Sequence, residues 1–192
     1  YCWCARERHQ TMPAVSGLRI SIASDMKLIA RKLEQGGKYD HLRVVRDDDS
    51  ETSCDMPRQG VLPHDLLHAV VESRLQFQDG FLGLVNKGAD IAFAEKNFRD
   101  YIDPIRHFEV AQAESVVEGL QTQLWAGEFD VDAFLAGVSG ACAMRKVAVP
   151  AMLESDGYLM FAQAVNLNAQ WQQVLVKAEF VLPFPIPAMD DA

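Results

Sequence analysis

The stretch from Leu62 to Glu72 holds the side chains best suited to chemistry, because imidazole and carboxylate groups recur there at a regular period. In a helix, at about 100° per residue, one stripe collects four of them: His64, Asp65, His68 and Glu72. Two histidines four residues apart on a helix can direct their nitrogens at one zinc ion. The sequence therefore predicts a divalent metal site, with zinc as the candidate ion and His64 and His68 as ligands. Asp65 is the expected catalytic residue, which polarises a metal-bound water for hydrolysis.

A third ligand has to come from elsewhere in the chain. Glu72 lies eight residues beyond His64, which is about 12 Å along a helix axis and too far for a shared metal. We expect the third ligand to be Glu95 or His107, both downstream. Asp65 stands where metalloproteases of the His-Glu-x-x-His class have a longer glutamate, and this substitution weakens the protease interpretation.

A second metal interpretation uses the adjacent pair His64-Asp65, which resembles the doublet of HD-domain phosphohydrolases. The resemblance implies an all-helical fold, with an upstream histidine and a downstream aspartate as further ligands. His41 lies upstream, and Asp130 or Asp132 lies downstream. The segment lacks that family's usual continuation after the doublet, and His41 falls in a predicted hairpin.

A non-catalytic interpretation is also open. The histidines then bond to buried carbonyl groups, and Asp65 stabilises the positive end of the helix dipole. The protein would be a structural or interaction protein with a buried hydrogen-bond network. Elsewhere, Glu114 and Glu118 lie one helical turn apart, which suits either a di-metal centre or a solvated carboxylate face.

Composition excludes several classes of protein. Of the 192 residues, 49% are hydrophobic and 23% charged, a profile typical of a soluble globular domain. There is no apolar run long enough for a membrane-spanning helix. The formal net charge of −9 repels phosphate backbones, so nucleic acid is not an expected partner. A small-molecule or peptide substrate is expected, and homo-oligomerisation is left open.

The cysteines and the termini complete the domain organisation. Four cysteines are too few for a disulfide scaffold of this size, so we expect a reducing, cytoplasmic compartment. Residues 1–16 are predicted to be a disordered arm or an extension, 17–183 a single domain, and 184–192 a loose tail.

The hydrophobic pattern predicts an α+β fold. Strict alternation favours strands at 18–23 and 174–182, with Pro183 ending the second. Residues 39–46 and 51–56 flank a polar turn typical of a hairpin, and 25–35 is expected to be a short helix or a loop. Helices are predicted at 63–76, 81–85 with Gly88 as cap, 110–125 closed by Gly127, 132–146 capped by Asp130 or Asp132, and 155–171 capped by Ser155. The resulting architecture is a small, mainly antiparallel sheet packed against a layer of about five helices.

The segment Leu-Pro-His-Asp-x-x-His-x-x-Val-Glu, placed after an N-terminal hairpin, resembles a group of uncharacterised bacterial proteins. The resemblance covers about the first half of the chain, together with Trp171 and the last strand. The resemblance implies the domain assignment above, but it implies no particular activity.

Overall fold

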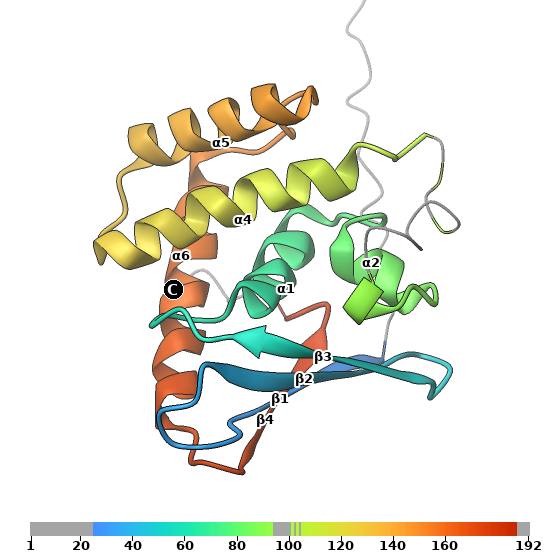
Figure 1. Ribbon diagram of the computed structural model, residues 1–192. Coiled ribbons are helices and arrows are strands. Elements are labelled where there is room, and N and C mark those ends of the chain that lie inside the picture. Colours follow the sequence, from blue (N-terminus) through green and yellow to red (C-terminus); the bar gives the residue numbers. More distant parts are fainter. Residues whose placement is uncertain (1–24, 94–100, 102, 104, 188–192) are drawn as a thin grey trace, which may run out of the picture.

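The computed structural model describes residues 25–93, 101, 103 and 105–187. In this part of the chain four strands form one antiparallel sheet in the order β3-β2-β1-β4. The strands are β1 (Met26–Arg31), β2 (Tyr39–Val45), β3 (Glu51–Pro57) and β4 (Glu179–Phe184). Figure 1 shows the helices gathered on one face of this sheet. The predicted α+β fold with an antiparallel sheet is confirmed.

The prediction of a helix or loop at 25–35 is wrong, because Met26–Arg31 is a central strand of the sheet. Leu28, Ile29 and Leu33 have helical spacing, but Met26, Leu28 and Ala30 also alternate, and these three are fully buried. Pairing with β2 on one side and β4 on the other decides in favour of the strand. The strand predicted at 18–23 lies outside the described residues, as does the predicted arm at 1–16.

The C-terminal strand is shifted relative to its prediction. It begins at Glu179 and continues through Pro183, which pairs with Lys27, to Phe184. The expectation that Pro183 ends the pairing is therefore wrong. Because β4 is an edge strand, a proline that lacks an N–H is tolerated there. Phe184, the first residue of the predicted loose tail, is part of this strand and is buried.

The helices lie close to their predicted positions. They are α1 (His64–Leu75), α2 (Phe81–Asn86), the 3-10 helix η1 (Ile91–Phe93), α4 (Glu109–Ala126), α5 (Val131–Arg145) and α6 (Glu154–Gln173). The side chain of Asp130 caps α5 by accepting from Ala133 N, and Gly127 closes α4 in a left-handed conformation. The N-cap of α6 is Leu153, so the predicted cap at Ser155 is wrong. Among the described residues we find no helix with the length and apolar character needed to cross a membrane.

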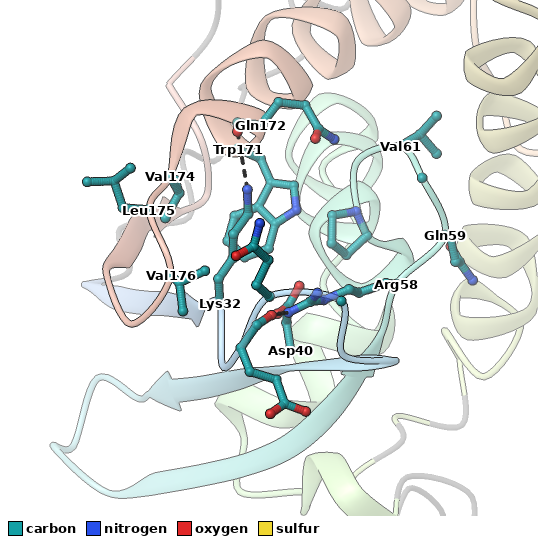
Figure 2. Close-up of a pocket in the computed structure, with 15 residues that line it drawn as sticks. Lys32, Asp40, Arg58, Gln59, Val61, Trp171, Gln172, Val174, Leu175 and Val176 are labelled. Carbon is teal, nitrogen blue, oxygen red and sulfur yellow. Dashed lines mark hydrogen bonds and ion pairs between the residues drawn. The ribbon is translucent and has the colours of Figure 1, made fainter.

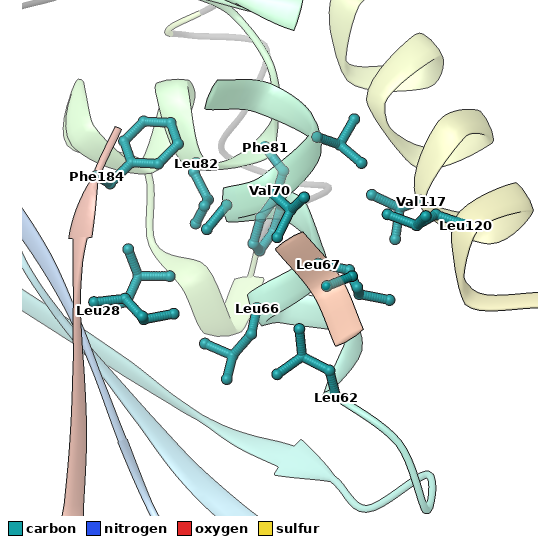
Figure 3. Close-up of a cluster of buried hydrophobic side chains, with 14 of the residues drawn as sticks. Leu28, Leu62, Leu66, Leu67, Val70, Phe81, Leu82, Val117, Leu120 and Phe184 are labelled. Carbon is teal, nitrogen blue, oxygen red and sulfur yellow. The ribbon is translucent and has the colours of Figure 1, made fainter. Parts of the chain in front are cut away.

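Helix α1 is covered on two sides, and this position explains its composition. Its leucines and valines pack against Leu28 and Phe184 of the sheet, while Val117 and Leu120 of α4 close the opposite side (Figure 3). Every residue from Leu66 to Glu72 is buried. Polar side chains in this stretch are therefore held inside the molecule, where each needs a partner.

Candidate metal centre

Three side chains from two helices converge at the contact between α1 and α4. His64 and His68 lie one turn apart on α1, and Glu114 reaches them from α4. The Nε2 atom of His64 is 3.2 Å from Glu114 Oε2, and that of His68 is 3.3 Å from Glu114 Oε1. One ligand atom from each residue lies within 4.8 Å of the other two. We call these three residues the His-His-Glu group.

The other ring nitrogen of each histidine is already engaged. His68 Nδ1 lies 2.9 Å from Glu72 Oε1, and His64 Nδ1 lies 3.3 Å from Gln121 Oε1. The amide nitrogen of Gln121 donates to Gln59 Oε1, which leaves the Gln121 oxygen to accept from His64. Acceptors hold both Nδ1 atoms, and both Nε2 atoms face Glu114, so a metal ion that displaces the Nε2 protons would meet two lone pairs directed at one point. This outer support is the usual arrangement around metal-binding histidines.

Glu72 is a buried carboxylate with three hydrogen-bond donors around it. Besides His68, it accepts from the backbone N–H groups of Leu82 and Gly83, at 3.0 and 3.2 Å, in the first turn of α2. Gly80 makes this approach possible, because a Cβ there would lie 2.5 Å from the carboxylate carbon of Glu72. The side chain of Glu72 therefore joins the metal-site helix to the start of α2.

The electrostatics of the group reflect these hydrogen bonds. Burial disfavours charge on His68, but hydrogen bonds to Glu114 and Glu72 outweigh it and raise the pKa of His68 to about 10. Burial likewise opposes ionisation of Glu114, yet hydrogen bonds from His64 and His68 hold the pKa of this carboxyl well below its usual range. Positive charge is thus favoured at the point where the three side chains meet.

The group is buried on one side and accessible on the other. The side chain of His68 is 1% exposed, whereas His64 and Glu114 are 28% and 31% exposed. The ring of His68 also packs against Phe81, with centroids 4.8 Å apart. Solvent can therefore reach the group from the His64 side, while His68 anchors it in the core.

The remaining predicted site residues are distributed as follows. Asp65 lies beside the group and interacts electrostatically with both imidazoles and Glu114, and burial raises the pKa of its carboxyl. His107 is exposed, packs its ring on Phe108 and is not part of the group. Glu95, the other predicted third ligand, lies outside the described residues.

The alternative metal interpretations find no support in the positions of their residues. His41 lies on β2 opposite Asp55, and Asp130 caps α5. The sheet itself departs from the all-helical fold that the HD-domain resemblance implies. Glu118 is half exposed and pairs with Arg145 on α5, so it does not join Glu114 at a common centre.

Sequence reasoning missed the role of Glu114 as a partner of the histidines, and it missed Gln121 entirely. A signal was present, because the two residues are seven positions apart and therefore lie on one face of α4. That spacing shows which side chains share a face. It does not show that this face meets α1, which is a property of the tertiary packing.

Comparisons of the chain with protein-family models, curated proteins and solved structures found no match. The function of the His-His-Glu group therefore has to be inferred from its own geometry.

Proposed function

We propose that His64, His68 and Glu114 bind a divalent metal ion, with zinc as the proposed ion, and that the protein is a metal-dependent hydrolase. The observation that carries the proposal is the convergence of two Nε2 atoms and one carboxylate, with both Nδ1 atoms held by acceptors outside the group. Small molecules or peptides are the proposed substrates.

Each imidazole lies at a suitable distance from one oxygen of Glu114, and the three ligand atoms, now within 4.8 Å of one another, would draw closer around a tetrahedral ion. Zinc bonds to nitrogen and oxygen of about 2.0–2.1 Å place neighbouring ligand atoms about 3.3 Å apart. The two separations between imidazole and carboxylate are 3.2 and 3.3 Å. Two histidines and a glutamate are also a donor set that zinc hydrolases use, with a water as the fourth ligand. The partial exposure of His64 and Glu114 supports access for that water.

Asp65 is the proposed general base, next to His64 in the sequence and within electrostatic range of the whole group. A carboxylate that accepts a proton from metal-bound water would complete the hydrolytic machinery. The proposed compartment remains the cytoplasm. Cys54 and Cys142, which lie in the described ranges, are free thiols, and this supports a reducing environment.

A non-catalytic role is the alternative, and one observation favours it. Both nitrogens of the buried His68 already have carboxylate partners without a metal. In this interpretation the imidazolium of His68 stabilises the packing of α1 against α4 through Glu114 and against the start of α2 through Glu72. The protein then serves as a structural or interaction protein.

Metal binding by untagged, chelator-treated protein separates the two functions. We expect isothermal titration with zinc to give one site per chain, and elemental analysis of freshly purified protein to find zinc, iron or manganese. Glu114→Gln and His68→Ala should abolish binding, and His107→Ala is the matched control that should bind as the wild type does. Absence of bound metal in the purified wild type, together with no zinc binding in the titration, would leave the structural role.

A further inference from the structure

A hollow of about 640 Å³, which no member of the His-His-Glu group lines, lies at the end of the sheet where β1 leads into β2. Residues of the β1–β2 connection, the loop before α1 and the segment after α6 surround it (Figure 2). Its volume falls within the range of about 300–1,000 Å³ that is typical of small-molecule sites.

Two cations form the polar wall of this hollow. Lys32 Nζ donates to Gln172 O at 3.2 Å and lies 5.0 Å from the ring centroid of Trp171. Arg58 donates through Nη2 to Asp40 Oδ1 and to Glu34 O, each at 2.6 Å. Its Nε is buried and has no hydrogen-bond partner among the described residues. The ammonium group of Lys32, which has three N–H donors, thus keeps donor capacity that the described residues do not use, whereas the buried Nε of Arg58 is closed to a ligand.

Two carboxylates, Asp40 and Glu34, line the hollow together with the two cations. Asp40 is 2% exposed, and its Oδ1 accepts from Arg58 and from Leu33 N, so its charge is already compensated. Glu34 is exposed at the rim. Within the described part of the chain, Lys32 has no carboxylate at ion-pair distance. The formal charges of the four residues therefore sum to zero, and the ammonium group of Lys32 is the cation that makes no ion pair with a described carboxylate.

The wall beside Lys32 is apolar. It consists of the ring of Trp171, which is 3% exposed, and of aliphatic side chains from the segment after α6. Leu175 and Val176 of that segment are 75% and 45% exposed, so two neighbouring aliphatic side chains are accessible at the edge of the hollow. A ligand with an apolar body would cover them.

We propose that this hollow binds an organic carboxylate, whose head group lies between Lys32 and Arg58 and whose apolar body rests on Leu175 and Val176, beside the edge of Trp171. The inference does not depend on the metal proposal. The two sites share one structural link, because Gln59 lines the hollow and also accepts from Gln121, the residue that supports His64.

Hexanoate is a suitable probe, and titration of the isotope-labelled protein followed by amide and indole NMR signals is a suitable measurement. We expect saturable shifts of the Trp171 indole signal, which a Trp171→Phe variant identifies. Lys32→Met should weaken hexanoate binding by about tenfold or more, the value of a charge-assisted hydrogen bond. Lys27→Met is the matched control, since Lys27 lies exposed on β1, the strand that Lys32 follows, and outside the hollow, and the affinity of this variant should stay at the wild-type value.

Chemical controls decide which features of the ligand matter. Hexan-1-ol, which keeps the apolar body without the charge, and inorganic phosphate, which keeps charge without the body, should each bind more weakly than hexanoate. Equal binding of either compound, or unchanged affinity in Lys32→Met, would overturn the proposal, as would the absence of saturable shifts with hexanoate. If Lys32→Met does not fold, Leu175→Asp at the exposed rim takes its place and should weaken hexanoate binding, and an unchanged affinity would contradict the proposal.

Discussion

The variant Glu72→Ala is the strongest test of how the buried polar side chains of α1, His68 and Glu72, stabilise the protein. Glu72→Ala removes the acceptor of His68 Nδ1 and of the N–H groups of Leu82 and Gly83. Each buried donor left without an acceptor costs about 1–3 kcal/mol, and breaking a buried ion pair costs about 3–5 kcal/mol. Because these contributions overlap, we expect the free energy of unfolding to fall by about 4 kcal/mol, which is a large share of a typical domain's stability.

Urea unfolding at neutral pH measures this change, with the slope of the transition expected to stay constant. Glu118→Ala is the matched control. It removes a half-exposed carboxylate that pairs with Arg145, and we expect a loss below about 1 kcal/mol. Glu72→Ala should also weaken zinc binding by about 10- to 100-fold, because the orientation of His68 is lost. A loss of stability as small as that of Glu118→Ala would refute the reasoning that Glu72 compensates buried donors.

Three further predictions follow from contacts in the same region. Gly80→Ala places a Cβ against the carboxylate of Glu72 and should lower the free energy of unfolding by about 1–3 kcal/mol in the same urea assay. Zinc affinity should rise from pH 6 to pH 8, by up to about tenfold per unit, because the ion displaces a proton from His68, whose pKa is raised to about 10. Titrations in two buffers of different ionisation enthalpy would reveal the released proton, and a flat pH profile would contradict this. Asp79→Asn should destabilise the protein at pH 7, since Asp79 is fully buried and pairs with Lys87. Burial opposes the charge of Asp79, but the hydrogen bonds from Lys87 and from Asp103 N, together with the charges of Lys87 and Arg106, outweigh it and lower the pKa. The stability it contributes is therefore present at neutral pH and lost as pH falls through the folded-state pKa, so the difference in melting temperature should shrink toward pH 3.

Local patterns in the sequence predicted much of the fold. The hairpin around residues 47–50, the helix that begins after Pro63 and the closing Gly127 of α4 depend on turn residues and helical periodicity close in the chain. Met26–Arg31 was assigned incorrectly, because its apolar residues fit both periods and only pairing with two neighbouring strands resolves the choice. The six residues of β1 alone do not show that β2 and β4 will pair with them.

The candidate site was predictable only in part for a similar reason. The spacing of His64 and His68 on α1 indicated that two imidazoles share a face. The third member, Glu114, comes from α4, and its position depends on how two helices pack across the core. Glu72 was expected to lie too far along the helix to bind the same metal. In the structure it supports His68 from the opposite ring nitrogen instead.

The free-energy cost of burying the His68–Glu72 pair supports a functional interpretation. Replacing a buried ion pair by apolar residues of similar volume is often neutral or stabilising in proteins. His68 and Glu72 nevertheless lie 1% and 0% exposed in a helix that is otherwise packed with leucine and valine. With a metal ion bound, His68 would serve as a ligand and Glu72 would hold its ring in position, so the buried pair would contribute to metal binding.

X-ray absorption at the zinc edge, on untagged protein loaded with one equivalent of zinc, tests the proposed ligand set most directly. We predict two imidazole nitrogens and one carboxylate oxygen at about 2.0–2.1 Å, with a water completing four ligands. Glu114→Gln should change this spectrum or lose the ion, whereas His107→Ala should leave the spectrum unchanged. A wild-type spectrum with six oxygen neighbours and no imidazole scattering would contradict the metal centre.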